Sequence, residues 1–155
     1  MPNNTQDPRA QFEQVEELLT HWLKERRELL AKYAEIGVYL DTQASADVLA
    51  ERQAAFCELL VDYTSAGHFE VYHELLNEAE SFADGSVVLA QQLMPAIGDT
   101  TEVILAYEEK YSARGADNGK LKRDLSALGE VLESRFALED RLIAGLHNSH
   151  RRQLG

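Results

Sequence analysis

The chain has 155 residues, and its 15 Lys and Arg against 27 Asp and Glu give a formal net charge of −12 at pH 7. We therefore expect no direct binding to DNA or RNA, which requires a basic face that displaces the counterions of phosphates. The charge favours a basic protein partner, although an acidic surface also serves solubility alone. The length suits a single domain. We expect residues 1–155 to form one helical bundle with disordered tails at residues 1–6 and about 150–155.

The cellular location that the sequence predicts is the cytoplasm. The chain has a single cysteine, Cys57, which cannot form an intramolecular disulfide. The opening residues, MPNNTQDPRAQ, have neither the basic nor the apolar region of a secretory signal. No apolar run approaches the roughly 18 residues that cross a bilayer, so we expect no membrane segment.

The first predicted helix begins at Asp7-Pro8, because Asp is a favoured N-cap and Pro suits the first helical turn. Gly37 is its predicted C-cap. Residues at spacings of three and four form its seam: Phe12, Val15, Leu19, Trp22, Arg26, Leu29, Tyr33 and Ile36. Such a seam could also belong to an extended coiled coil, but the stop at Gly37 favours a compact bundle.

After a connection over residues 38–44, a helical pattern begins at Ser45 or Asp47 and runs to Phe82. It is longer than the first helix, and Gly67 is unfavourable in a helix interior. We therefore predict a break or kink near Gly67 that leaves two segments in one bundle position.

The second half of the chain predicts two more helices. Ser86 is the expected N-cap of the third, and Pro95 should bend it about a turn upstream. Residues 112–119, SARGADNG, read as a loop. The last helix starts near Lys120 and should fray from His150 onward. No alternating strand pattern occurs, so the predicted fold is an all-α, up-down-up-down antiparallel four-helix bundle.

Two motifs, one in each half of the chain, carry a family resemblance. The first is Leu60-Val61-Asp62-Tyr63, followed by Ser65-Ala66-Gly67-His68-Phe69 and Tyr72. The second runs from Glu133 to Ile143 as ESRFALEDRLI, similar to the pattern Glu-x-Arg-Phe-x-Leu-Glu-Asp-(Lys/Arg)-Leu-Ile. Both resemble signatures of the Rsd/AlgQ family of bacterial anti-sigma factors, and their order and separation argue against a chance match.

The resemblance implies a four-helix bundle that regulates transcription. Members of that family bind the primary sigma factor and reduce its association with the RNA polymerase core and with promoters. A principal target there is the C-terminal DNA-binding region of sigma, a helix-turn-helix domain. Its basic face would complement this acidic chain.

The expected sigma-contacting residues carried over from the first motif are Asp62, Ser65 and Phe69. Helical rotation of about 100° per residue also places these three together with Glu58, away from the apolar face that includes Tyr63. Phe69 would be the apolar anchor, Asp62 a charge partner for Arg or Lys, and Ser65 a small hydrogen-bonding residue. Glu58 and Tyr72 complete the predicted binding residues. Alternatively, Phe69 packs in the core after the break at Gly67.

Charged residues at seam positions form a second predicted feature. Arg26 lies on the seam of the first helix, and Arg135 and Glu139 compete for seam positions in the last. These side chains could extend to water or form a buried ion-pair layer that fixes helix register. Antiparallel pairing places Arg26 level with about Glu130 to Glu133, which supplies its partner.

A metal- or small-molecule-binding bundle of the haemerythrin or di-iron type is the alternative function. The di-iron pattern requires two Glu-x-x-His pairs, and Glu70 with His73 is the only one in the sequence. Phosphate-cradling Gly-rich loops are absent from the sequence, and Cys57 lies about three helical turns from His68. We therefore expect neither an enzyme nor a cofactor.

Overall fold

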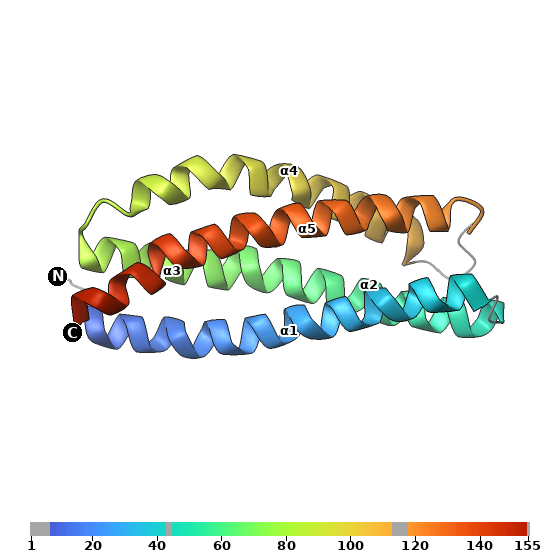
Figure 1. Cartoon of the computed structure of the whole chain (residues 1–155), viewed down its shortest axis with the longest axis horizontal. Helices are drawn as coiled ribbons and strands as arrows, with labels where there is room; N and C mark the ends of the chain where they lie inside the picture. Colours follow the sequence, from blue (N-terminus) through green and yellow to red (C-terminus); the bar gives the residue numbers. More distant parts are fainter. Residues whose placement is uncertain (1–6, 43–44, 113–117, 155) are drawn as a thin grey trace.

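The computed structural model describes residues 7–42, 45–112 and 118–154, and every regular element in these ranges is helical. The elements are α1 (Pro8–Thr42), α2 (Ala46–Ala66), the π-helical turn η1 (Gly67–Val71), α3 (Tyr72–Phe82), α4 (Val87–Tyr111), α5 (Leu121–Leu146) and the 3-10 helix η2 (Asn148–Leu154). Helices α2 and α3 are joined through η1 into one nearly continuous helix. Figure 1 shows this long helix side by side with α1, α4 and α5, and each runs antiparallel to the next along the chain. The predicted antiparallel four-helix bundle is confirmed. The tail predicted at residues 1–6 lies outside the described residues.

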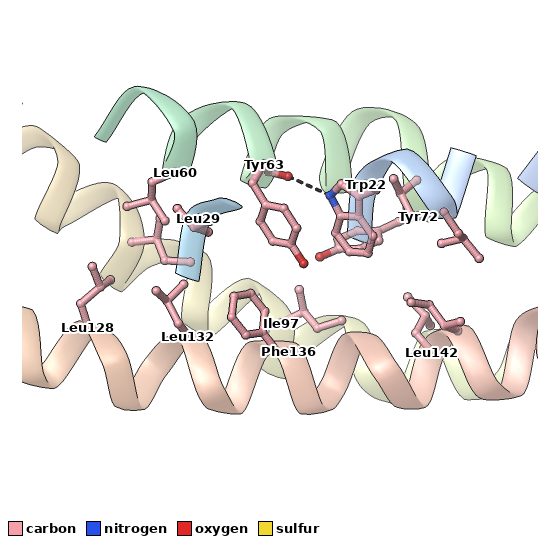
Figure 2. Packing of buried hydrophobic residues seen from close by; sticks show 14 of the residues in the cluster. Trp22, Leu29, Leu60, Tyr63, Tyr72, Ile97, Leu128, Leu132, Phe136 and Leu142 are labelled. Carbon is pink, nitrogen blue, oxygen red and sulfur yellow. Dashed lines mark hydrogen bonds between the residues drawn. The ribbon is translucent and has the colours of Figure 1, made fainter. Parts of the chain in front are cut away.

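The core lies along the bundle axis, where each helix contributes one apolar stripe. Helix α1 packs mainly on α2 and α3, α4 packs mainly on α5, and α1 contacts α5 chiefly through long side chains such as Tyr33 and Arg26. The predicted seam of α1 is buried at Phe12, Val15, Leu19, Trp22, Leu29 and Ile36. Figure 2 shows these stripes meeting around Trp22, Tyr63 and Phe136.

The predicted break at Gly67 is confirmed, and it takes the form of a single π turn inside an otherwise continuous helix. A side chain at Gly67 would place its Cβ 2.9 Å from Cζ2 of Trp22, so close packing requires glycine there. The Trp22 indole N–H donates to the Tyr63 carbonyl at 3.1 Å (Figure 2). The tryptophan therefore fixes the last turn of α2 and the start of η1 together.

The predicted end of α1 is wrong, because the helix continues through Gly37 to Thr42. Leu40 packs against the core, and Arg52 of α2 donates to the Tyr39 hydroxyl at 3.3 Å, so tertiary contacts outweigh the glycine. Ser45 is the N-cap of α2, as predicted, and accepts from the Val48 N–H at 3.3 Å. Residues 43–44 of the predicted connection lie outside the described residues, as do residues 113–117 of the predicted loop.

The start of α4 and the C-terminal segment differ in part from what the sequence predicted. Helix α4 begins directly after Ser86, but the Ser86 side chain caps nothing and faces His150 instead. Pro95 lies within α4, which is bowed in Figure 1. The predicted fraying from His150 is wrong, since residues 148–154 form η2.

Within the described residues, no helix combines the length and the apolar character that crossing a membrane requires.

Candidate functional site

The outer face of the π turn presents the aromatic residue that the sequence singled out. Phe69 is 76% exposed, which rules out the alternative that it packs in the core. Glu58 and Asp62 are exposed on the preceding helix, and Ser65 is half-buried. The rotation argument therefore holds for these four positions.

The π turn explains why an aromatic side chain faces outward here. The Tyr72 N–H donates to the Gly67 carbonyl, an i to i+5 bond that inserts one residue relative to an α-helix. Val71 and Tyr72 then turn inward, whereas Phe69 points outward. The surface assignment of Tyr72 is wrong: this residue is only 2% exposed, because its ring packs at right angles to Trp22.

A carboxylate from α1, that of Glu25, joins the same surface, and the sequence alone did not indicate it. Burial and the nearby charges of Asp62, Glu28 and Glu70 raise the pKa of Glu25 above its ordinary value. The Glu25 Oε2 atom is buried and has no hydrogen-bond donor among the described residues. We call Phe69 with Glu25, Asp62, Ser65 and Glu70 the acidic Phe69 face. It concentrates negative charge beside one exposed aromatic ring.

A groove of about 440 Å³ continues this face between α1 and α3. Its lining residues are Gln14, Glu17, Leu18, His21, Phe69, Glu70, His73 and Glu74. The Glu70 and His73 pair thus opens onto the surface and not into the bundle core, where a di-iron site would lie. No group of three or more His, Cys, Asp or Glu in residues 7–42, 45–112 and 118–154 is arranged to hold a metal ion.

Beneath the acidic Phe69 face lies a buried polar layer centred on Glu139. One carboxylate oxygen accepts from Arg26 at 3.1 Å and from the Tyr63 hydroxyl at 2.5 Å. The other accepts from Arg135 at 3.1 Å and from the Tyr72 hydroxyl at 2.5 Å. The ion-pair hypothesis is therefore confirmed for Arg26, Arg135 and Glu139. We call these residues, with Tyr63 and Tyr72, the Glu139 layer.

The predicted partner of Arg26 is wrong. The Arg26 side chain is 12% exposed and pairs with Glu139 and with Asp140, the latter at 2.6 Å. Glu130 and Glu133 are exposed instead. The helix register is offset because α1 extends past Gly37, which moves Arg26 about two turns further along α5. The guanidinium also lies 4.7 Å from the ring centroid of Phe136, a cation–π distance.

Arg135 is tied to α4 as well as to Glu139. It donates to the hydroxyls of Thr100 at 2.9 Å and Thr101 at 2.8 Å. Burial and then the charge of Glu139 raise the pKa values of Tyr63 and Tyr72, which keeps both hydroxyls protonated as donors. The tyrosines and threonines were not predicted as members of the layer. The only sequence signal for the tyrosines is an aromatic residue with a polar tip on an otherwise apolar stripe.

The layer positions the surface above it. Tyr63 and Tyr72 stand on either side of the π turn, and both donate to the same carboxylate on α5. Glu139 therefore holds the two ends of the segment that presents Phe69. This contact joins the two sequence motifs physically, since Tyr63 and Tyr72 lie in the first and Glu139 in the second.

These features define a helical bundle with a buried polar layer beneath an exposed acidic face, and comparison with known proteins places the chain in a family. Residues 1–147 match the model of the family described as regulator of RNA polymerase sigma(70) subunit, Rsd/AlgQ, and the chain belongs to this family. It is a family of regulators and not a class of enzymes.

Individual relatives agree with this assignment. The chain is 34% identical over 131 residues to a regulator of sigma D from Yersinia pseudotuberculosis serotype O:1b (strain IP 31758), covering 82% of this chain and 78% of the relative. It is 32% identical over 136 residues to a regulator of sigma D from Pectobacterium atrosepticum, covering 85% and 89% of the two chains. No solved structure matches the chain significantly.

Proposed function

We propose that this protein is an anti-sigma factor that binds the primary sigma factor of bacterial RNA polymerase in the cytoplasm through the acidic Phe69 face. Binding reduces the association of sigma with the polymerase core and with promoters. The observation that carries the proposal is the 76% exposed Phe69 ring, held on a π turn among carboxylates. Exposed aromatics of this kind dominate binding energy when a partner buries them.

The chemistry of the face selects a basic partner. Burial raises the pKa of Glu25, and repulsion from the neighbouring Asp62, Glu28 and Glu70 raises it further. An Arg or Lys of the partner relieves this repulsion and supplies the donor that the Glu25 carboxylate does not find among the described residues. The C-terminal DNA-binding region of sigma offers such basic residues, because it contacts phosphates.

Four members of the acidic Phe69 face have separate roles in this proposal. Phe69 is the apolar anchor, Asp62 and Glu25 are charge partners, and Ser65 allows the partner backbone to approach closely. Glu58 extends the charged rim. Mutual charge attraction raises the association rate and selectivity more than the affinity.

Titration of the protein against the isolated C-terminal region of sigma tests the proposal. We expect Phe69→Ala to weaken binding by about 2 kcal/mol, roughly 30-fold, with stability unchanged within about 1 kcal/mol. Leu105→Ala is the matched control, because Leu105 is also an exposed large apolar residue but lies on α4. Stable Phe69→Ala protein that binds sigma as tightly as the control would remove this face from the interface.

A competition experiment tests the regulatory step. The wild-type protein should displace sigma from the polymerase core and lower promoter binding by the holoenzyme, and Phe69→Ala should need a higher concentration for the same effect. Tight binding to sigma without any loss of core or promoter association would leave a sigma-binding protein that is not an anti-sigma factor.

A further inference from the structure

The C-terminal helix η2 is attached to the bundle by two buried histidines. His147 ends α5, and His150 lies within η2; both side chains are fully buried. The His147 ring stacks on Phe12 with centroids 4.1 Å apart, and the His150 ring stacks on Phe82 at 4.0 Å. The segment thus covers the end of the bundle where α1 begins and α3 ends.

Each ring lies between two carboxylates. The Nδ1 of His147 is 2.6 Å from Oε1 of Glu78, and its Nε2 is 2.7 Å from Oε1 of Glu16. The Nδ1 of His150 is 2.5 Å from the other oxygen of Glu78, and its Nε2 is 3.0 Å from Oδ2 of Asp84. Glu78 is itself fully buried and is shared by both rings.

Counting protons fixes the charge of His147. Both of its nitrogens face carboxylate oxygens, each contact needs a proton, and a neutral imidazole carries only one. The hydrogen bond from His147 lowers the pKa of Glu16, which keeps that partner ionised. His147 is therefore an imidazolium when Glu78 is ionised. His150 differs, because its Nε2 also lies 3.3 Å from the Ser86 hydroxyl, which can donate to it.

The charged groups that face the rings come from every packed element. They are Glu16 of α1, Glu78 of α3, Asp84 of the turn before α4 and, through its contact with Glu16 at 3.1 Å, Arg151 of η2. A neutral His147 ring would turn a lone pair toward a carboxylate oxygen inside the protein, which is costly.

We propose that His147 forms a proton-dependent latch between Glu78 and Glu16, which holds η2 against the bundle near neutral pH and releases it when the ring loses its proton. Burial acts against the charge of His147, but its bonds to Glu78 and Glu16 raise its pKa above the ordinary value. A raised histidine pKa contributes stability that is complete below about pH 6.5 and is lost as the pH rises through the folded value. Release therefore occurs on the alkaline side.

The protonation state can be measured directly on the wild-type protein. Two-bond proton–nitrogen correlation spectra distinguish the imidazolium from both neutral tautomers. We expect His147 to be an imidazolium at pH 7 and to lose that signature only at higher pH, while the exposed His21, His68 and His73 serve as references in the same spectrum. A neutral tautomer of His147 at pH 7 would overturn the latch.

Hydrogen exchange of the η2 amides tests the release. After correction for intrinsic rates, the opening of η2 should increase about tenfold per pH unit between the ordinary histidine pKa and the raised pKa of His147, since each opening in that range releases one proton. Glu78→Gln should flatten this dependence, because an amide can satisfy a neutral ring. Glu80→Gln, an exposed residue two positions along α3, removes the same charge and should behave as wild type. Wild-type opening that does not change between pH 7 and 10 would overturn the proposal.

Discussion

Glu139 and Glu78 are both fully buried carboxylates, yet their partners differ in chemistry. Glu139 accepts from two arginines and two tyrosines, whose charge states do not change near neutrality. Glu78 is bound by two histidines, and one of them, His147, lies between two carboxylates that raise its pKa. The first is a fixed point of the bundle centre, whereas the second makes the attachment of one end depend on pH.

The location of each carboxylate suits this difference. The Glu139 layer lies mid-bundle, where Arg135 also reaches α4, so four bundle positions meet at one charge. Glu78 joins α3 to the short terminal helix η2 at one end of the bundle. A permanent charge pair therefore stabilises the surface that carries Phe69, and a titratable one is confined to the periphery.

Removing Glu139 should have the largest effect on stability. Glu139→Ala leaves Arg26 and Arg135 buried without their shared counter-charge, which typically costs about 3–5 kcal/mol. Denaturant unfolding measures the loss, and Glu133→Ala, an exposed glutamate on the same helix, is the control. A loss below about 1 kcal/mol would mean that the layer contributes little to the fold.

Arg26→Ala should have the next largest effect, about 3 kcal/mol, because it leaves two acceptors on Glu139 and Asp140 without their cation. Arg27→Ala, at the neighbouring exposed position, should cost little. Equal midpoints and slopes for the two variants would show that Arg26 behaves as a solvated side chain despite its burial.

The sequence predicted the helices and the outward Phe69 because both follow from local periodicity. It did not predict that α1 continues past Gly37, since that depends on contacts of Leu40 and Tyr39 made only in the folded bundle. The wrong partner for Arg26 follows from this, because the register between two helices depends on where each ends.

The remaining site features come from outside the helix that carries the motif. Glu25 joins the acidic Phe69 face from α1, and periodicity within one helix cannot show which face of another lies beside it. Tyr72 was misplaced because it was taken from the motif, and a match of residue types does not show that the π turn directs this side chain into the core. His147 and His150 were missed because a polar terminal segment has no apolar pattern to predict its burial.

The smallest effect, and the one that separates stability from binding, concerns Glu25. Its pKa is raised by burial and neighbouring carboxylates, so the ionised form disfavours the folded state once the pH rises through the folded value. Glu25→Gln should therefore stabilise the protein slightly at pH 7, by less than about 1 kcal/mol, and not at pH 4. The same change should weaken binding to the C-terminal region of sigma, and this loss should shrink as salt rises.

Glu13→Gln, at an exposed position on α1 outside the acidic Phe69 face, should change neither property. A Glu25→Gln protein that gains stability and keeps its full affinity would show that the repulsion among these carboxylates is not relieved by the partner.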